Sequence, residues 1–122
     1  MALLIGNVTI DCAEAPSLAE FWTAAIGYEV TEASDDGAVL VDPERNRVSL
    51  YLQQVEAPTP GKNRVHLDLE TDDVEREVER LSGLGARTLR AYRPPEGSWT
   101  VMADPEGNEF CVCPVDDERR DG

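Results

Sequence analysis

The sequence contains one five-residue motif twice, and this repeat limits the folds that the chain can adopt. Asp42 to Asn46 reads DPERN, and Asp104 to Asn108 reads DPEGN. In such a phrase the aspartate accepts backbone N–H groups, the proline presets φ, and a glycine or asparagine supplies a positive φ. Both copies are therefore predicted to be tight turns. Because Arg45 replaces the glycine in the first copy, we expect Asn46 to take the left-handed conformation there.

The segments around the first turn follow an order that recurs later. Apolar and polar residues alternate over 4–12, which predicts a half-buried strand. Ser17 to Glu20 reads SLAE and fits a capping box, so a helix is predicted from about Ser17 to Ile26, with Gly27 as its C-terminal cap. Two short strands at 28–33 and 38–41 and a third, alternating strand at 47–55 are then predicted.

The second half of the chain repeats this order after a linker at 56–62 that contains two prolines. Alternation over 64–70 predicts a strand, and Asp72 with Glu75 predicts the start of a second helix that ends at Gly85. The remaining predicted strands are 86–92, 98–103 and 108–113.

This order predicts an α+β fold built from two tandem βαβββ modules, at about 1–57 and 62–115. A chain of 122 residues is expected to form one domain, here 1–115, because it is too short for two independent cores. The acidic tail at 116–122 has nothing to bury and is predicted to be disordered.

Charge and cysteine content indicate which binding partners and which cellular compartment to expect. Acidic residues number 25 against 11 basic ones, and the net charge of −14 disfavours binding to a phosphate backbone. No apolar run reaches the roughly 18 residues of a membrane-spanning helix, and Met1 to Gly6 lacks the basic start of a signal peptide. Cys12, Cys111 and Cys113 fit neither a disulfide framework nor a zinc finger. We expect a cytoplasmic protein with reduced thiols, no nucleic-acid partner and no membrane contact.

These segments resemble the vicinal-oxygen-chelate superfamily, which includes glyoxalase I, extradiol dioxygenases and bleomycin-resistance proteins. The resemblance covers about 4–115 and is closest to small glyoxalase-like proteins. It is carried by NVTIDCAEAPSLAEFW, IGYEV, HLDLETDDVEREVERLSGLGA and DPEGNEFCV. It implies modules that form one cupped mixed sheet, with helices on the convex side and a ligand cavity on the concave side. It also implies a homodimer.

The resemblance further implies metal-ligand positions on the first and last strand of each module. In this sequence they fall on Asn7, Ser49, His66 and Cys111. Only His66 and Cys111 are ordinary ligands, so the expected site is degraded, and the cofactor is either none or a divalent metal such as Zn, Ni, Mn or Fe. An extradiol dioxygenase needs two histidines and a carboxylate on iron, so the single histidine argues against that activity.

The polar faces of the alternating strands are predicted to line the cavity. His66 and Asp68 are candidate catalytic residues, His66 as metal ligand or general base and Asp68 as an acid or base. These two residues and Cys111 each have a structural alternative: His66 as a hydrogen-bonding lining residue, Asp68 on a solvated strand face, and Cys111 as a small buried side chain. The candidate ligand-binding residues are Asn7, Thr9, Ser49, Tyr51, Trp99 and Glu109.

Three functions are compatible with the sequence. We expect a small-molecule-binding protein of the bleomycin-resistance type, with a cavity suited to cationic or aromatic ligands. The alternative is a glyoxalase-like lyase or isomerase that acts on a small oxygenated metabolite, with His66 as metal ligand or base. The third is a module without a ligand that serves only in assembly.

Overall fold

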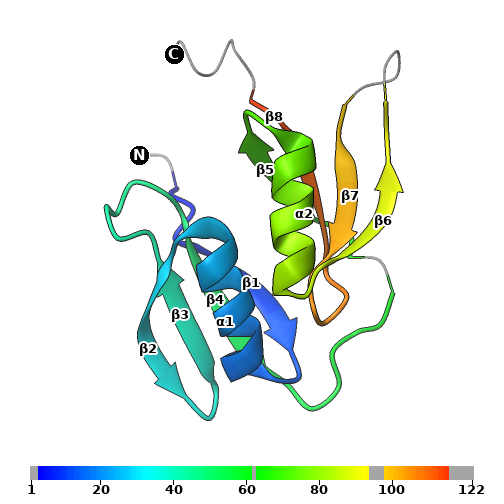
Figure 1. The fold of residues 1–122 in the computed structure, drawn as a ribbon. Helices are drawn as coiled ribbons and strands as arrows, with labels where there is room; N and C mark the ends of the chain where they lie inside the picture. The colour runs from blue at the N-terminus through cyan, green and yellow to red at the C-terminus, as the bar shows by residue number, and fades with distance from the viewer. Residues whose placement is uncertain (1–2, 62, 94–97, 116–122) are drawn as a thin grey trace. The chain divides into compact units, whose positions relative to one another are not determined.

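The structure is a computed structural model that describes residues 3–61, 63–93 and 98–115 of the chain (Figure 1). The chain divides into two compact units, Met1–Pro60 and Gly61–Gly122. Each unit contains a strand, a helix and three further strands in that order, which confirms the α+β fold and the two tandem modules. The predicted tail at 116–122 lies outside the described residues.

In the first unit, a four-stranded sheet is covered by one helix. The sheet has the order β1-β4-β3-β2, in which β1 runs parallel to β4 and the other pairs are antiparallel. Helix α1 packs on one face and buries Leu18 and Trp22 over Leu40 and Leu52. The elements are β1 (Asn7–Cys12), α1 (Ala15–Ile26), β2 (Glu29–Ser34), β3 (Gly37–Val41) and β4 (Ser49–Gln54).

The second unit has the same topology. Its sheet has the order β5-β8-β7-β6, with β5 parallel to β8. Its core contains the buried side chains of Leu81, Met102, Phe110 and Val112. The elements are β5 (Leu67–Thr71), α2 (Val74–Leu84), β6 (Arg87–Ala91), β7 (Thr100–Ala103) and β8 (Glu109–Pro114). Hydrogen bonds between the described strands thus define one four-stranded mixed sheet in each unit.

The start of α1 differs from the prediction. The helix begins at Ala15, two residues before Ser17, and Pro16 lies in its first turn. Proline suits this position because the first N–H groups of a helix have no partner within it. Glu14 is the N-cap but makes no side-chain cap hydrogen bond, and the Ser17 hydroxyl donates to the Glu14 carbonyl at 3.2 Å. The predicted capping box is therefore wrong, whereas the cap at Gly27, with φ of 75°, is confirmed.

The start of α2 is shifted by one residue from the prediction. The N-cap is Asp73, whose carboxylate accepts the backbone N–H of Arg76 at 3.1 Å, so Asp72 is not the cap. Gly85 ends the helix in the left-handed conformation, as predicted.

Both repeated phrases are tight turns whose aspartate accepts backbone N–H groups, as predicted, and both aspartates are buried. The Asp104 carboxylate accepts the N–H groups of the residues two and four positions later at 2.9 Å each, and Asp42 accepts the equivalent pair at 3.2 and 3.0 Å. The left-handed residue of the first turn is Arg45, with φ of 60°, and not Asn46. Gly107 has φ of 91° at the same place in the second turn, so the position in the turn, and not the residue type, sets this conformation.

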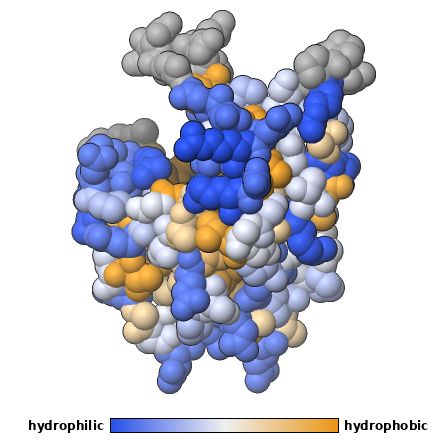
Figure 2. Space-filling view, viewed as in Figure 1, coloured by the Kyte–Doolittle hydropathy of each residue, from blue (hydrophilic) through white to orange (hydrophobic). Residues whose placement is uncertain are grey.

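Hydrophilic residues cover much of the surface visible in Figure 2, with smaller hydrophobic patches between them. This distribution agrees with the net charge of −14. In the described ranges, none of the helices has the length and apolar character needed to cross a membrane.

Candidate functional site

Strand register divides each sheet into a helix-covered face and an opposite face, which we call the open face. In β8, Phe110 is buried beneath the helix, and its neighbours Glu109 and Cys111 point the other way. Directly paired residues share a face. The register therefore sets one row across the open face of the second unit, formed by Asp68, Cys111, Val101 and Arg90.

A β-bulge places Arg90 in this row. The register between β6 and β7 shifts between Thr88 and Arg90, so Leu89 is the extra residue. Without the bulge, alternation from Arg87 would set Leu89 opposite Val101. Bulges re-aim the side chains that follow them. Here Arg90, and two positions later Tyr92, are turned toward the open face.

A cavity of about 230 Å³ lies among these side chains. Its aromatic wall is a stacked pair, Tyr92 and Trp99, with ring centroids 4.6 Å apart and planes inclined by 21°. The Tyr92 N–H donates to the Trp99 carbonyl at 2.8 Å, which fixes the backbones that carry the two rings. The cavity is lined by His66, Arg90, Tyr92, Trp99, Val101, Glu109, Phe110 and Cys111.

An acidic side chain, Glu109, and a basic side chain, Arg90, lie next to each other in the cavity wall. The Glu109 side chain is 14% exposed, and its Oε1 lies 3.5 Å from Nη2 of Arg90. That oxygen is buried and accepts no hydrogen bond from the described residues. The Glu109 N–H donates to Oδ1 of Asn63 at 2.9 Å, and the Asn63 amide also donates to the Val65 carbonyl. Asn63 therefore ties the segment that leads to His66 onto β8.

The structure brings His66, Asp68 and Cys111 together. His66 directly precedes β5, and its Nε2 lies 3.2 Å from Oδ1 of Asp68. One donor atom from each of the three residues lies within 4.8 Å of the other two. Burial, and then the negative charge of Asp68 and a hydrogen bond with it, raise the pKa of the Cys111 thiol, so this sulfur is protonated at neutral pH.

These three donors fit a divalent metal of intermediate softness. Imidazole, carboxylate and thiolate together suit zinc, and three protein ligands with one open position are typical of catalytic zinc sites. A metal would have to displace the Cys111 proton, because the thiolate is the form that binds.

The other predicted residues lie on the open face of the first unit. Asn7 pairs with Ser49, and Thr9 pairs with Tyr51. The Asn7 amide donates to the Thr9 hydroxyl at 3.1 Å, and the Tyr51 hydroxyl donates to the Asp36 carbonyl at 3.4 Å. None of these four residues lines the cavity of the second unit.

Register also shows how the two units correspond. In the first unit Leu50 of β4 pairs with Val8 of β1, and in the second unit Phe110 of β8 pairs with Leu67 of β5. Leu50 and Phe110 therefore correspond, and the residue before each is the matching pair. The counterpart of Ser49 is thus Glu109 and not Cys111. This shift arises because the segment between the repeated turn and the strand after it is two residues longer in the first unit than in the second. The spacing of the repeated turns therefore does not carry over to the last strands.

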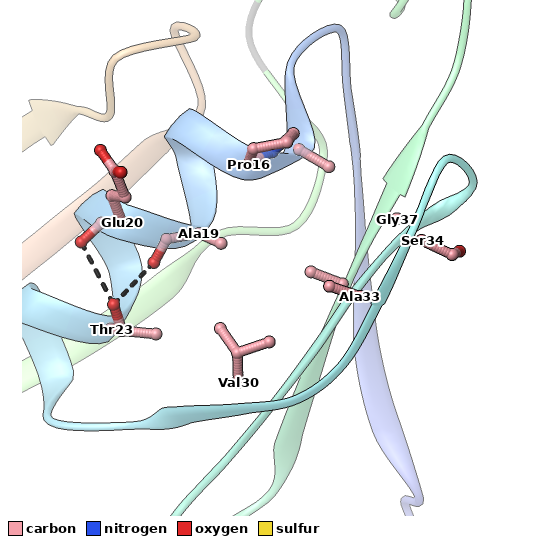
Figure 3. A pocket seen from close by; sticks show the side chains of 10 residues that line it. Pro16, Ala19, Glu20, Thr23, Val30, Ala33, Ser34 and Gly37 are labelled. Atoms are coloured by element: carbon pink, nitrogen blue, oxygen red, sulfur yellow. Dashed lines mark hydrogen bonds between the residues drawn. The ribbon is translucent and has the colours of Figure 1, made fainter.

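A second cavity, of about 180 Å³, lies in the first unit between α1 and the β2–β3 hairpin (Figure 3). Small residues leave it unfilled, among them Ala19, Ala33 and Gly37. The Thr23 hydroxyl at its edge donates to the carbonyls of Ala19 and Glu20, at 2.8 and 3.3 Å. Its polar hydrogen is therefore used within the helix.

Sequence reasoning missed Arg90, Val101 and Phe110 as cavity residues, and it missed the second cavity altogether. The position of Arg90 depends on the bulge at Leu89, and the letters RTLRA do not reveal a bulge. For the second cavity, the small residues of α1 and β3 were the available signal.

Comparison with known proteins gives a consistent result. Residues 7–113 match the glyoxalase-like domain family. A glyoxalase/bleomycin resistance protein/dioxygenase family enzyme from Burkholderia phytofirmans PsJN is similar in structure, with a TM-score of 0.74, 19% identity, and coverage of 88% of this chain and 95% of that chain. No curated protein sequence matches significantly.

Two further solved structures are similar. The antibiotic-binding protein TnmS3 from Streptomyces sp. CB03234 has a TM-score of 0.68 and 23% identity, and the alignment covers 95% of this chain and 99% of that one. A variant of the fosfomycin resistance protein FosX from Listeria monocytogenes, complexed with Mn(II) and 1S,2S-dihydroxypropylphosphonic acid, has a TM-score of 0.78 at 13% identity and covers 98% and 96%. At such identities the likeness shows the fold alone.

Proposed function

This chain belongs to the glyoxalase-like domain family, and on that premise we propose that it binds a small molecule in the cavity of the second unit. The observation that carries the proposal is the cavity itself, where an aromatic pair meets a few polar groups. A concave site with apolar walls and convergent polar groups is the usual form of a ligand pocket. The antibiotic-binding protein among the structural relatives gives further support.

The lining favours a small ligand with a flat, unsaturated part. A volume of about 230 Å³ is below the roughly 300–1,000 Å³ of pockets for drug-sized molecules. Stacking on Trp99 would contribute about 0.5–1.5 kcal/mol beyond area burial. Glu109 and Arg90 would orient polar groups of the ligand. As a separate set, on the open face of the first unit, Asn7, Thr9, Ser49 and Tyr51 are the proposed ligand-binding residues of that unit.

The test is a binding screen of small aromatic compounds, some of them cationic, with thermal shift followed by calorimetry. We expect Trp99→Ala to weaken the binding of the best compounds at least about tenfold, which corresponds to about 1.4 kcal/mol. Val30→Ala, in the wall of the other cavity, is the matched control and should leave their affinity unchanged. The proposal fails if no compound stabilises the protein, or if Trp99→Ala binds the compounds as well as the wild type.

A second candidate function, a metal-assisted lyase or isomerase, is favoured by the cluster of His66, Asp68 and Cys111. A divalent metal bound there would polarise an oxygen of the substrate. His66, Asp68 and Cys111 would be its three protein ligands, and Oδ1 of Asp68 lies 3.2 Å from Nε2 of His66. Glu109 lies in the same cavity, and in this candidate function its carboxylate would move a proton.

Cobalt titration tests this candidate without an activity assay. Cobalt should produce a sulfur-to-metal charge-transfer band in the wild type that disappears in Cys111→Ala and weakens in His66→Ala. Cys113→Ala, two positions along the same strand, is the matched control and should keep the band. Because the pKa of Cys111 is raised, affinity should increase with pH. An unchanged band in Cys111→Ala would rule out the cluster as a metal site.

We further propose that the protein is cytoplasmic, as expected from its sequence patterns, and that it forms a homodimer, as the resemblance implies. Cell fractionation tests the first statement, and the molar mass in solution tests the second.

A further inference from the structure

The two outer strands β2 and β6 carry the same pattern with inverted charge. They occupy the same place in their sheets, each at the end farthest from the first strand of its unit. Residues 29–33 read EVTEA, and residues 87–91 read RTLRA. The first strand therefore has two glutamates three positions apart, and the second has two arginines with the same spacing.

Both strands carry a bulge that brings their two charges onto one face. In β2 the register shifts between Val30 and Glu32, so that Glu29 pairs with Val41 and Glu32 with Val39. Val39 and Val41 are two positions apart in a strand and share a face. Glu29 and Glu32 therefore share it too, although residues three apart in a regular strand would point to opposite faces.

The bulge in β6 has the same effect on the arginines. Arg87 pairs with Ala103, and Arg90 pairs with Val101, which again lie two positions apart. In both units this is the open face. The two edges thus present matched rows of opposite charge with equal spacing.

The charged side chains on these edges are exposed, and their ion pairs within the chain are weak. All six residues of β2 are exposed, and β6 is exposed except at Leu89. Glu29 lies 3.4 Å from Arg45, and Arg90 lies 3.5 Å from Glu109. Exposed pairs of this kind contribute about 0–1 kcal/mol. Within the described part of the chain, Glu32 and Arg87 form no ion pair.

We propose that the β2 edge of one copy docks on the β6 edge of a second copy. An outer strand presents unpaired backbone N–H and C=O groups, which a second strand can satisfy. The equal spacing lets either strand direction bring two glutamates opposite two arginines. Opposite charges across the edge favour this pairing, and like charges disfavour pairing of β2 with β2 or β6 with β6.

The partner is a second copy because each edge finds its complement on the same chain. Arg90 lines the cavity of the second unit, so Glu32 of the other copy would lie at the rim of that cavity. The docking does not depend on a bound ligand, and it can fail or succeed independently of the proposed binding function.

Charge reversal in the full chain tests the docking by sedimentation velocity over a range of concentrations. E29R/E32R has arginines on both edges, and R87E/R90E has glutamates on both. We expect each variant to self-associate at least about tenfold more weakly than the wild type. An equimolar mixture should associate again, because each edge of one variant then meets its complement on the other. E75R/E79R, on exposed positions of α2, makes the same charge change as E29R/E32R and should associate like the wild type.

Three results would overturn the docking. They are a monomeric wild type at the highest concentration reached, unchanged association of the reversal variants, and a mixture that stays monomeric although both variants give wild-type circular dichroism spectra. If a double reversal does not fold, Glu32→Gln and Arg87→Gln remove one charge each, and either should weaken association. Unchanged association in both would also contradict the docking.

Discussion

At the scale of single residues, the repeated turn offers a matched pair of substitutions. Arg45 holds a positive φ that costs a non-glycine residue about 1 kcal/mol. Arg45→Gly removes this strain, but glycine has more freedom in the unfolded chain, which offsets part of the gain. The net result should be a free energy of unfolding that is higher by about 0.5–1 kcal/mol. Urea denaturation measures the change.

Gly107→Arg is the reverse change in the second turn and should lower the free energy of unfolding by a similar amount. A Cβ added there meets no atom within 4 Å, so backbone strain is the main cost. Destabilisation by Arg45→Gly would show that the Arg45 hydrogen bond to the Asp42 carbonyl, at 2.9 Å, outweighs the strain.

The carboxylate of Asp42 should make stability depend on pH. A hydrogen bond from Arg47, together with backbone N–H groups, lowers the pKa of Asp42 from its ordinary 3.8 to about 2. A lowered pKa in the folded state contributes stability that is complete above pH 3.8 and is lost as the pH falls through about 2. The stability difference between wild type and Asp42→Asn should shrink over this range. A constant difference from pH 7 down to about 2 would show that these hydrogen bonds do not lower the pKa of Asp42.

At the scale of elements, the N-cap of α2 can be located by substitution. Asp73→Ala should lower the free energy of unfolding by about 1 kcal/mol, because the Arg76 N–H loses its acceptor. Asp72→Ala, the cap expected from the sequence, should have a smaller effect. Equal effects in thermal unfolding would mean that both carboxylates serve the cap.

The start of β3 does not tolerate a side chain at Gly37. A Cβ there would lie 2.1 Å from the carbonyl oxygen of Leu52, a backbone atom that cannot move aside. Gly37→Ala should cost roughly 2–4 kcal/mol. Gly83→Ala in α2, where an added Cβ meets nothing within 4 Å, is the control and should stabilise by about 0.5–1 kcal/mol. A neutral Gly37→Ala would show that the hairpin can shift.

Helices and strands could be predicted where apolar and polar residues recur with a regular period. Alternation in β1 and β5 and the glycines that end both helices identified the modules correctly. The bulges at Thr31 and Leu89 were not predictable, because a bulge depends on how neighbouring strands pair and has no fixed residue pattern. One extra residue decides whether Arg90 or Leu89 faces the cavity. The site was therefore less predictable than the fold.

At the scale of the whole molecule, the repeat predicted two modules, but not where a cavity would remain. Cavities form where side chains fail to fill space, and this depends on packing in three dimensions. Tyr92 and Trp99 stack on each other and leave a hollow beside them, although they are seven positions apart. His66 and Cys111 lie in the same hollow, 45 positions apart in the sequence.

The two tryptophans allow a direct test of the central claim that the cavity of the second unit binds small molecules. Trp22 is 1% exposed in the core of the first unit, and Trp99 lines the cavity. The measurement is the pair of indole N–H signals in a nitrogen-15 NMR spectrum, assigned with Trp99→Phe, during titration with the compounds that stabilise the protein. We expect the Trp99 signal to shift in a saturable manner and the Trp22 signal to stay in place. If the stabilising compounds shift only the Trp22 signal, or neither signal, the ligand site does not lie in this cavity.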